Sequence, residues 1–325
     1  MRALVTRLGS DGRREKVLVT DWPEFEAPVG NQIRTQTICT AITNGTERND
    51  LLSGNYALPA EELPAIRGYQ NVGRVIAVGP AVSALCVGDL VYVGSQRGAG
   101  RRYAGHVEFV VIAEDGLLVK LPDGVDPIHA AMFGMGSVAM RSCRHAELRM
   151  GERLLIVGGA GCVGQLAAQI ATHMGARVTV CDIDDRRLDL ARDIGAAEDV
   201  VDVSGDGWDE HIADSAYDAV LDLAGVPGME DKLIAAVRRR GRVLLVSGRR
   251  QISYTFNLGQ EREITIKQNS HFDRDDLQNL CRLVACGLVK IGPLVRDVVP
   301  VTEAGQIYAK LRDHPSQLMG TVFEW

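Results

Sequence analysis

The sequence predicts an α/β protein of two domains, with a parallel β-sheet covered by helices in its second half. The chain has 325 residues, and at roughly 150 residues per domain this length predicts two domains. Residues 1 to about 120 read as short strands separated by turns, whereas strand and helix alternate from about residue 128. Hydrophobic residues make up 46% of the chain and charged residues 24%, so ordinary globular cores can form.

The individual elements follow from short apolar runs and their spacing. In the first half, the β-branched runs Val91–Val93 and Val107–Ile112 predict strands. Beyond residue 128 the spacing is that of βαβ units, which place parallel strands in one sheet. We expect strands at Arg153–Val157, Arg177–Cys181, Ala219–Leu223 and Arg242–Val246, with a further candidate strand at Ile264–Lys267. We expect helices at 161–174, Arg186–Ile194, Met229–Val237, Asp275–Cys286 and Ala304–Leu311.

Charge and composition exclude several classes of protein. The formal net charge is -6, which argues against a nucleic-acid-binding protein, because a surface that binds nucleic acid is basic. No apolar run approaches the ~18 residues needed to span a bilayer, and the first residues lack the apolar stretch of a signal peptide. We therefore expect a cytoplasmic protein that binds neither nucleic acid nor membrane. The seven cysteines are odd in number and form no C-x-x-C pair, which argues against a disulfide framework or a four-cysteine zinc site.

A glycine-rich segment is the first candidate binding site. Residues 159–164 read G-A-G-C-V-G and fit the G-x-G-x-x-G pattern of a dinucleotide-binding turn, placed between a predicted strand and a predicted helix. Gly159 permits the tight turn, Gly161 lets the backbone approach a pyrophosphate, and Gly164 lets helix and strand pack closely. Cys162 and Val163 lie at the helix N-terminus, whose N–H groups favour phosphate. These features predict a Rossmann domain, a doubly wound parallel sheet; the alternative is a glycine-rich turn in another α/β protein.

An acidic residue after the next strand bears on the choice of cofactor. Asp182 follows Gly159 by about 20 residues, the spacing expected of an acid that binds the ribose hydroxyls. A carboxylate there accepts hydrogen bonds from a free 2′-OH and repels a 2′-phosphate, so NAD is favoured over NADP. The alternative is a solvated acid in an acidic turn, since Asp184 and Asp185 follow. Arg187 is either close to the adenosine end of the cofactor or a cation on a helix surface.

Several further segments resemble one known family. They are G-Y-Q-N-V-G-R-V-I-A-V-G at 68–79, G-D-L-V at 88–91, N-G-T-E at 44–47, G-H-V-E-F at 105–109 and the strand-turn-helix at 154–168. In this order they resemble the medium-chain dehydrogenase/reductase family of zinc-type alcohol dehydrogenase-like proteins. The resemblance covers nearly the whole chain. It implies a GroES-like β-barrel domain at 1–127, the Rossmann domain at 128–270, and a segment at 271–325 that returns to the first domain. It also implies an active site in the cleft between the domains and a homodimer joined at its sheet edges.

The departures from the family pattern concern zinc. Asn44 stands where zinc members have their first cysteine ligand, and Tyr69 and Gln70 replace the histidine and glutamate of G-H-E. The four-cysteine zinc lobe is missing, and residues 94–104 take its place. Because Asn, Gln and Tyr are poor zinc ligands, we expect that neither zinc site survives. The alternative is a metal site rebuilt from His106 or His129. Among zinc-lacking relatives, the N-G-T-E stretch most resembles the branch of bacteriochlorophyllide a dehydrogenase.

Without zinc, side chains must stabilise the oxygen whose charge changes during hydride transfer. By the resemblance, Thr46 matches the proton-relay hydroxyl, and Glu47 matches the acid that would orient Thr46 or Tyr69. Tyr69 occupies the lost histidine position; a phenol with a pKa of about 10 is a poor base but a good donor in the reductive direction. His106 is a further candidate base. The alternatives are that Tyr69 only fills the cavity, that Glu47 forms a structural ion pair with an arginine, and that His106 is structural.

These observations predict a zinc-independent, NAD-dependent oxidoreductase acting on a secondary alcohol or ketone, in a biosynthetic pathway. The alternatives are a reductase of activated C=C bonds that uses NAD(P)H, and a non-catalytic protein that binds a dinucleotide. The substrate is a small molecule. Arg97, Arg101 and Arg102 favour an anionic one because arginine forks bind carboxylate or phosphate, although a charged loop can simply be solvated.

Overall fold

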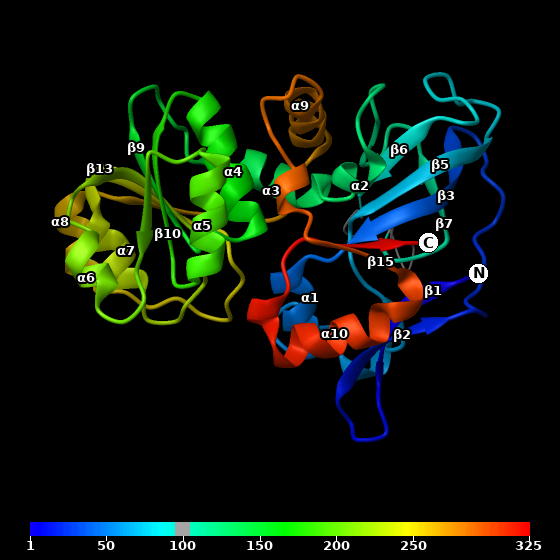
Figure 1. Cartoon of the computed structure of the whole chain (residues 1–325), viewed down its shortest axis with the longest axis horizontal. Coiled ribbons are helices and arrows are strands. Elements are labelled where there is room, and N and C mark those ends of the chain that lie inside the picture. The colour runs from blue at the N-terminus through cyan, green and yellow to red at the C-terminus, as the bar shows by residue number, and fades with distance from the viewer. Residues whose placement is uncertain (95–104) are drawn as a thin grey trace. The chain divides into compact units, whose positions relative to one another are not determined.

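The computed structural model describes residues 1–94 and 105–325, and the chain forms two compact units (Figure 1). The first unit comprises residues 1–134, 273–285 and 291–325, and the second comprises residues 135–272 and 286–290. The sequence predicted domain boundaries at 127/128 and 270/271. Helix α2 (Pro127–Ala130) belongs to the first unit because it packs on that unit's strands.

Residues 286–290 belong to the second unit because side chains of that unit hold their backbone. The Gln169 side chain accepts from the backbone N–H of Lys290 at 2.6 Å and donates to its carbonyl oxygen at 3.1 Å. The His173 ring lies 2.6 Å from the carbonyl oxygen of Leu288. The periodicity of the sequence did not predict that residues 286–290 return to the second unit.

The first unit is built on two sheets. A three-stranded sheet has the order β2-β1-β4, and a larger sheet has the order β15-β16-β3-β5-β6-β8, with β7 also paired to β3. The C-terminal strand β16 pairs antiparallel with β3, so the end of the chain returns to the first unit. The strands are β1 (Ala3–Leu8), β2 (Arg14–Val19), β3 (Gln32–Ala41), β4 (Ala65–Ile66), β5 (Asn71–Val78), β6 (Leu90–Val93), β7 (Phe109–Ala113), β8 (Leu118–Lys120), β15 (Asp297–Pro300) and β16 (Thr321–Glu324).

Helices pack against the strands of these sheets, and two of the helices carry residues of the candidate site. Helix α1 covers Asn44–Leu51 and therefore includes the whole N-G-T-E stretch. Helix α10 (Ala304–Asp313) packs against β2 and α1, and α9 (Arg274–Ala285) packs against β8. A buried apolar core fills the space under the larger sheet, with Ile33, Val75 and Val91 fully buried.

The second unit is a parallel sheet of six strands in the order β11-β10-β9-β12-β13-β14. This is the 3-2-1-4-5-6 order of the doubly wound fold, in which chain order reverses between β9 and β12. The strands are β9 (Arg153–Val157), β10 (Arg177–Asp182), β11 (Asp199–Asp202), β12 (Tyr217–Asp222), β13 (Val237–Leu245) and β14 (Thr265–Gln268).

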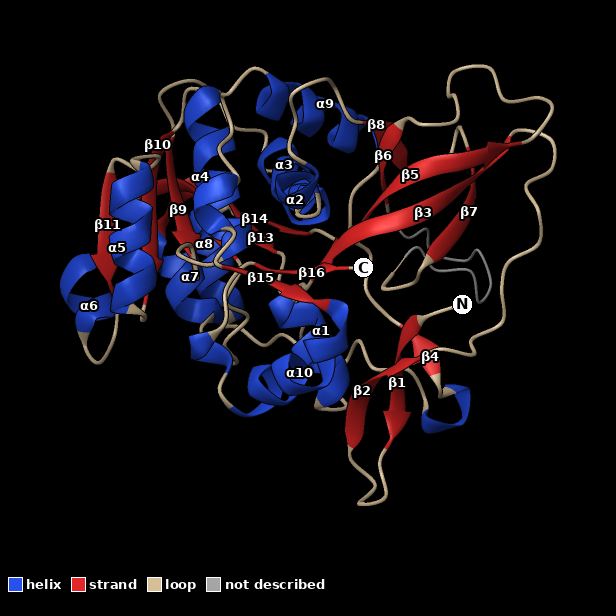
Figure 2. Ribbon diagram, turned by 45° about the vertical axis from the view of Figure 1, so that its right-hand side comes forward, coloured by secondary structure: helices blue, strands red, loops and turns tan. Residues whose placement is uncertain are grey.

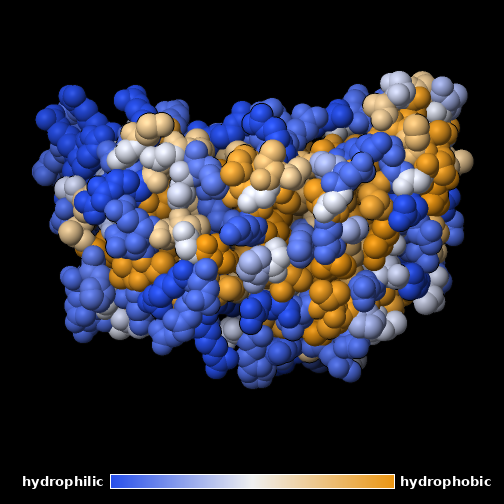
Figure 3. All heavy atoms as spheres, turned by 45° about the horizontal axis from the view of Figure 1, so that its top comes forward, coloured by the Kyte–Doolittle hydropathy of each residue, from blue (hydrophilic) through white to orange (hydrophobic). Residues whose placement is uncertain are grey.

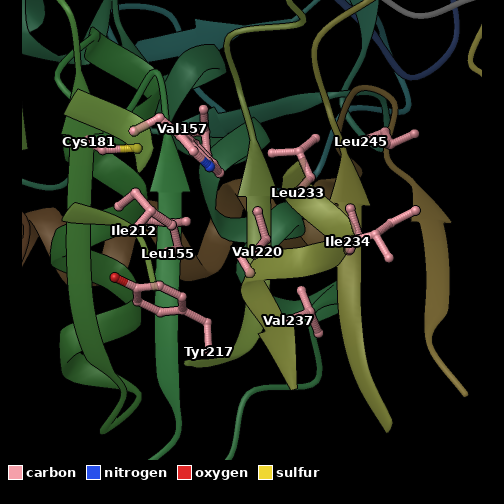
Figure 4. Close-up of a cluster of buried hydrophobic side chains, with 13 residues drawn as sticks. Leu155, Val157, Cys181, Ile212, Tyr217, Val220, Leu233, Ile234, Val237 and Leu245 are labelled. Carbon is pink, nitrogen blue, oxygen red and sulfur yellow. The ribbon is translucent and has the colours of Figure 1, made fainter. Parts of the chain in front are cut away.

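Helices lie on both faces of this sheet (Figures 1 and 2). They are α3 (Phe133–His145, which begins in the first unit), α4 (Cys162–His173), α5 (Asp185–Ile194), α6 (Gly207–His211), α7 (Glu230–Ala236) and α8 (Phe256–Arg262). Because both faces are covered, the strands are apolar on both sides, and Leu154, Leu155 and Ile156 are all fully buried. Figure 4 shows Leu155 and Val220 from neighbouring strands in one cluster with Leu233 and Ile234 of α7.

Local signals explain where these helices begin and end. The Asp184 side chain caps α5 by accepting from the backbone N–H of Arg187, and Gly195 ends the helix with a left-handed φ of 68°. Asp126 caps α2 in the same way, with Pro127 at the first helical position. Among the described residues, none of the helices is long and apolar enough to cross a bilayer.

The visible surface is mixed in polarity. Figure 3 shows hydrophilic residues over much of one face with hydrophobic residues between them. Exposed large apolar side chains occur in both units, including Val29 and Val87 in the first and Met150 in the second. Scattered exposure of this kind is usual in globular proteins, so it does not by itself mark a binding surface.

Candidate active site and dinucleotide site

The glycine-rich turn lies between β9 and α4 in the second unit, as the sequence predicted. A Cβ added to Gly164 would lie 2.4 Å from the carbonyl oxygen of Gly159, so this helix and turn approach too closely for any side chain. A Cβ on Gly159 would lie 2.6 Å from the carbonyl oxygen of Ile156. At Gly161 the nearest atom would be 3.6 Å away, which leaves the space above that residue open. The three glycines therefore serve the packing, turning and access that the motif requires.

The N-terminus of α4 is available to an anion. Gly161 is the N-cap residue and supplies no side-chain cap, while Cys162 and Val163 form the first turn and are partly exposed. The partial positive charge of a helix N-terminus favours phosphate. The Gln165 side chain donates to the carbonyl oxygen of Ala160 at 2.7 Å and braces the turn from inside the helix. This cradle fits the pyrophosphate of a dinucleotide.

Asp182 is the last residue of β10 and contacts the glycine-rich turn directly. Its Oδ2 accepts from the backbone N–H of Ala160 at 3.1 Å, and its Oδ1 accepts from Ile183 at 2.8 Å. The carboxylate therefore has a fixed position at the carboxyl end of the sheet, where such folds bind ligands. Arg187 lies on α5 with its Nε 3.6 Å from Asp184, so this arginine is held by the helix cap.

In the first unit, a buried network surrounds Glu47 of α1. Glu47 Oε1 accepts from the backbone N–H of Thr43 at 2.9 Å, and its Oε2 accepts from the Tyr308 hydroxyl at 2.5 Å. His106 Nε2 lies 3.2 Å and Lys16 Nζ 3.7 Å from the same Oε2. All four of these side chains are buried. Burial alone would raise the pKa of Glu47, but His106, Lys16 and Tyr308 outweigh it and lower the pKa to about 2. Glu47 is therefore a carboxylate at neutral pH.

His106 is fixed on every side of its ring. Its Nδ1 lies 2.7 Å from the Thr40 hydroxyl, which also accepts from Trp325 Nε1 at 2.9 Å. Gly68 lies against the ring with a φ of 96°, and a Cβ there would come within 2.8 Å of the imidazole. His106 is fully buried, so a substrate cannot reach it without a rearrangement.

Tyr69 is partly buried and holds its proton firmly. Burial raises the pKa of its phenol to about 12, although a hydrogen bond with the Thr43 side chain acts in the opposite direction. Gly134 packs against its ring, because a Cβ at Gly134 would lie 2.8 Å from Tyr69 Cε2. Gln70 donates to Thr43 Oγ1 at 3.0 Å. Tyr69 is thus a neutral phenol at physiological pH and can donate a hydrogen bond.

The remaining positions of the family's zinc motifs make other contacts. Asn44 donates through Nδ2 to the carbonyl oxygen of Leu318 at 2.8 Å, and Thr46 is half-buried on α1. His129 lies 3.8 Å from Asp126 and close to Gly292. Within residues 1–94 and 105–325, no group of three His, Cys, Asp or Glu side chains is arranged to hold a metal ion. Arg97, Arg101 and Arg102 lie outside the described residues.

The structure brings together Glu47 and His106, and places Tyr69 on Thr43, whose backbone N–H binds Glu47. Sequence reasoning missed Lys16, Thr40, Thr43 and Tyr308 as members of this network. Tyr308 is 261 residues from Glu47 in the chain, and no motif links the two. The predicted cofactor-binding residues are gathered in the second unit, around one edge of its sheet.

Comparisons with known proteins give the same two-part organisation. A family model described as an alcohol dehydrogenase GroES-like domain matches residues 33–123, and one described as a zinc-binding dehydrogenase matches residues 162–285. The first match lies within the first unit, while the second falls largely in the second unit and extends into α9. The predicted fold class, a Rossmann sheet with a GroES-like domain, is therefore confirmed.

Individual relatives differ in the reaction that their names describe. The chain is 31% identical over 201 residues to the chloroplastic NADPH-dependent alkenal/one oxidoreductase of Arabidopsis thaliana, a match that covers 60% of this chain and half of that relative's length. It is 25% identical over 284 residues to the 2-dehydro-3-deoxy-L-galactonate 5-dehydrogenase of Pseudoalteromonas atlantica, covering 80% of this chain and 83% of that one. A solved structure of an NAD-dependent alcohol dehydrogenase has a TM-score of 0.83 over the full length of both chains at 23% identity, which shows the shared fold. Taken with the two family models, these likenesses show that the chain belongs to the medium-chain dehydrogenase/reductase superfamily of zinc-type alcohol dehydrogenase-like oxidoreductases.

Proposed function

We propose that the protein is a zinc-independent dehydrogenase that transfers a hydride between NAD(H) and a secondary alcohol or ketone. The observation that carries this proposal is the site at the carboxyl edge of the parallel sheet, where the open glycine turn, the uncapped N-terminus of α4 and the fixed Asp182 carboxylate adjoin. This site fits the pyrophosphate and a ribose with a free 2′-OH. A bound nicotinamide supplies the hydride donor or acceptor.

The contacts of Asn44 and Gln70 support a reaction without zinc. Asn44 stands where zinc members have a cysteine ligand, Gln70 replaces the glutamate of G-H-E, and both amides donate hydrogen bonds to neighbouring protein atoms. Glu47 is held by Thr43 and Tyr308. Such a protein would belong to the zinc-lacking branch that the N-G-T-E stretch resembles. Elemental analysis of the purified protein should find no stoichiometric zinc, and one zinc per chain would overturn this part of the proposal.

The proton chemistry is assigned to Tyr69 and Thr46. In the reductive direction the Tyr69 phenol donates a hydrogen bond to the substrate oxygen, because its raised pKa keeps it protonated. Thr43 holds this phenol by its hydrogen bond, and Glu47 holds Thr43 through the backbone. Thr46 offers a second hydroxyl from α1, the helix that the Glu47 network fixes in place. His106 then acts by orienting Glu47 from within the core.

The choice of cofactor has a direct test at Asp182. We expect a higher kcat/KM with NAD than with NADP. Asp182→Asn should shrink that preference by about tenfold, because a carboxylate repels a 2′-phosphate and an amide does not. Asparagine keeps one oxygen that can accept from Ala160 in the turn, and the bond that it gives up is the one from Ile183, which lies outside the turn. Asp184→Asn, at the acid that caps α5, is the matched control and should leave the preference unchanged. A wild-type preference for NADP would contradict the proposal.

A second candidate function is the reduction of activated C=C bonds with NADPH. The match to the Arabidopsis thaliana alkenal/one oxidoreductase favours it. The two are separated by screening secondary alcohols with NAD and enones with NADPH while following the absorbance of the reduced cofactor. Activity with enones alone would replace the first proposal by the second. Tight dinucleotide binding without activity on either broad panel would indicate a binding protein.

We also infer a cytoplasmic homodimer that uses a small-molecule substrate and no membrane or nucleic acid. Strand β14 ends the order of the second unit's sheet, with β13 on one side, so it offers an edge for pairing with a second copy. Sedimentation at micromolar concentration should give the mass of two chains. A monomer at that concentration would contradict the assembly but not the activity.

A further inference from the structure

Three loops meet at the carboxyl edge of the second unit's sheet. The turn after β9 touches the loop after β12, because a Cβ on Gly158 would lie 2.9 Å from the backbone nitrogen of Ala224. The loop after β12 touches the loop after β13, because a Cβ on Gly225 would lie 2.8 Å from the Cβ of Ser247. The positions of these loops are therefore coupled from the glycine turn across to β13.

A buried charge cluster ties the second and third of these loops together. Arg249, in the loop after β13, donates through Nη2 to Asp222 at the end of β12 and through Nη1 to Glu230 of α7 at 3.1 Å. The side chains of Arg249, Asp222 and Glu230 are 8%, 2% and 6% exposed, so the three charges are shielded from water. Charge-assisted hydrogen bonds of a planar guanidinium fix both partners in direction as well as distance.

The same two carboxylates also hold the loop backbone. Asp222 Oδ1 accepts from the backbone N–H groups of Ala224 at 3.1 Å and Gly225 at 3.0 Å. Glu230 Oε2 accepts from the N–H of Gly228 at 3.0 Å. The cluster thus connects the Arg249 guanidinium to three amides of residues 223–228. Moving the guanidinium would shift the loop that these amides define.

The position of this cluster in the sheet decides which part of a ligand it serves. Ligands of doubly wound sheets bind where chain order reverses, which here is between β9 and β12. Asp182 on β10 lies on the adenosine side of that point. The fold consists of two mononucleotide-binding halves, so the loops after β12 and β13 face the other mononucleotide.

We propose that Arg249, clamped between Asp222 and Glu230, is a positioning residue that shapes the 223–228 and 247–249 loops for the nicotinamide half of the dinucleotide. This inference rests on the proposed dinucleotide binding and deepens it. Arg249 acts through the loops and not by contact with the reacting atoms. A misplaced loop weakens the binding of the nicotinamide half, while the adenosine half keeps its own contacts on β10 and α4.

The test compares two ligands that share the adenosine half. NADH carries both halves, whereas ADP-ribose lacks the nicotinamide ring. Titration calorimetry on the full chain should show that Arg249→Lys raises the Kd for NADH by about tenfold and leaves the Kd for ADP-ribose within about twofold. If the wild type prefers NADPH, that dinucleotide and 2′-phospho-ADP-ribose take their places.

The chain offers a matched control at the opposite edge of the same sheet. Arg242 pairs with Glu152 just before β9, and their side chains are 12% and 11% exposed. Arg242→Lys also exchanges a shielded guanidinium for an amine, so it should lower the melting temperature to a similar degree. It should leave both ligand affinities within about twofold, because its partner Glu152 precedes β9 and Arg242 itself pairs with Thr265, the first residue of β14, away from the carboxyl ends of these strands.

Each other outcome overturns the inference. Equal loss of NADH and ADP-ribose affinity in Arg249→Lys would show a role in the stability of the whole unit, and no loss of either would show no role. If Arg249→Lys does not fold, Asp222→Asn keeps the shape of the side chain and must give the same selective loss. A wild type that binds neither ligand would instead refute the proposed function itself.

Discussion

The glycine turn of the second unit and the Glu47 network of the first unit are built in opposite ways. The turn consists of backbone atoms from neighbouring residues, with Asp182 and Gln165 as its side-chain contacts. The network consists of buried side chains from β2, α1, the segment before β7 and α10, with Glu47 and His106 at its centre. The glycine turn depends on the absence of side chains, because a Cβ atom at Gly159 or Gly164 would clash with the backbone. The Glu47 network depends on charges that must all be present, because a buried charge without its partner is costly.

The largest effect should come from removing the charge of Glu47. Glu47→Gln leaves Lys16 and His106 buried without their carboxylate, and breaking a buried pair costs about 3–5 kcal/mol. The free energy of unfolding from urea titration measures this loss. Glu108→Gln is the control, because Glu108 pairs with Arg2 at a partly exposed site and should cost less than about 1 kcal/mol. Similar losses of unfolding free energy in the two variants would show that the Glu47 network stabilises the protein no more than an ordinary surface ion pair does.

Tyr69→Phe should change the activation free energy of catalysis by about as much as Glu47→Gln changes the free energy of unfolding. The substitution removes the hydroxyl and keeps the ring that packs on Gly134. Loss of one such donor typically lowers kcat by about 10²–10³. If kcat stays within about threefold, the phenol serves packing, and the role must move to Thr46 or a bound water. Thr46→Val provides that second test, and an unchanged kcat in both variants would refute the proposed proton path.

Acid should destabilise the first unit through Glu47. Its folded pKa is about 2, below its ordinary value of 4.5, so its contribution is fully present above about pH 4.5 and is lost as pH falls toward 2. The loss is about 3 kcal/mol. The free energy of unfolding, measured from pH 7 to pH 2, should fall with decreasing pH in the wild type and fall less steeply in Glu47→Gln. An equally steep fall in the variant would mean that other carboxylates cause the sensitivity to acid.

The smallest of these effects should separate two glycines of the same turn. Gly164→Ala forces a Cβ against the backbone of Gly159, an overpacking that should cost about 1–3 kcal/mol of stability. Gly161→Ala meets open space, so stability should change by less than about 0.5 kcal/mol, while its methyl group obstructs the approach of a pyrophosphate and weakens NADH binding. Thermal unfolding and NADH titration of both variants measure the two quantities. A larger loss of stability in Gly161→Ala would reverse our assignment of roles.

This contrast also explains what the sequence could predict. The strand at Arg153–Val157 has the predicted bounds, and α4 (Cys162–His173) differs by one residue at each end from the predicted 161–174. A local turn leaves its pattern in consecutive residues. The short acidic strand β11 was missed because its residues are half-exposed and show little periodicity, and α1 was missed because N-G-T-E is a poor helix sequence. Lys16 and Tyr308 could not be predicted, because their contacts with Glu47 bridge distant parts of the chain.

The return of the C-terminal segment has a consequence for synthesis on the ribosome. Glu47 and His106 leave the exit tunnel long before Tyr308, which follows His106 by 202 residues, and before Trp325, which anchors Thr40. The parallel sheet, by contrast, draws its strands from residues 153–268 and can assemble while the tail is still being made. The buried network of the first unit is therefore complete only once α10 has been made, because Glu47, Lys16 and His106 each contact Tyr308.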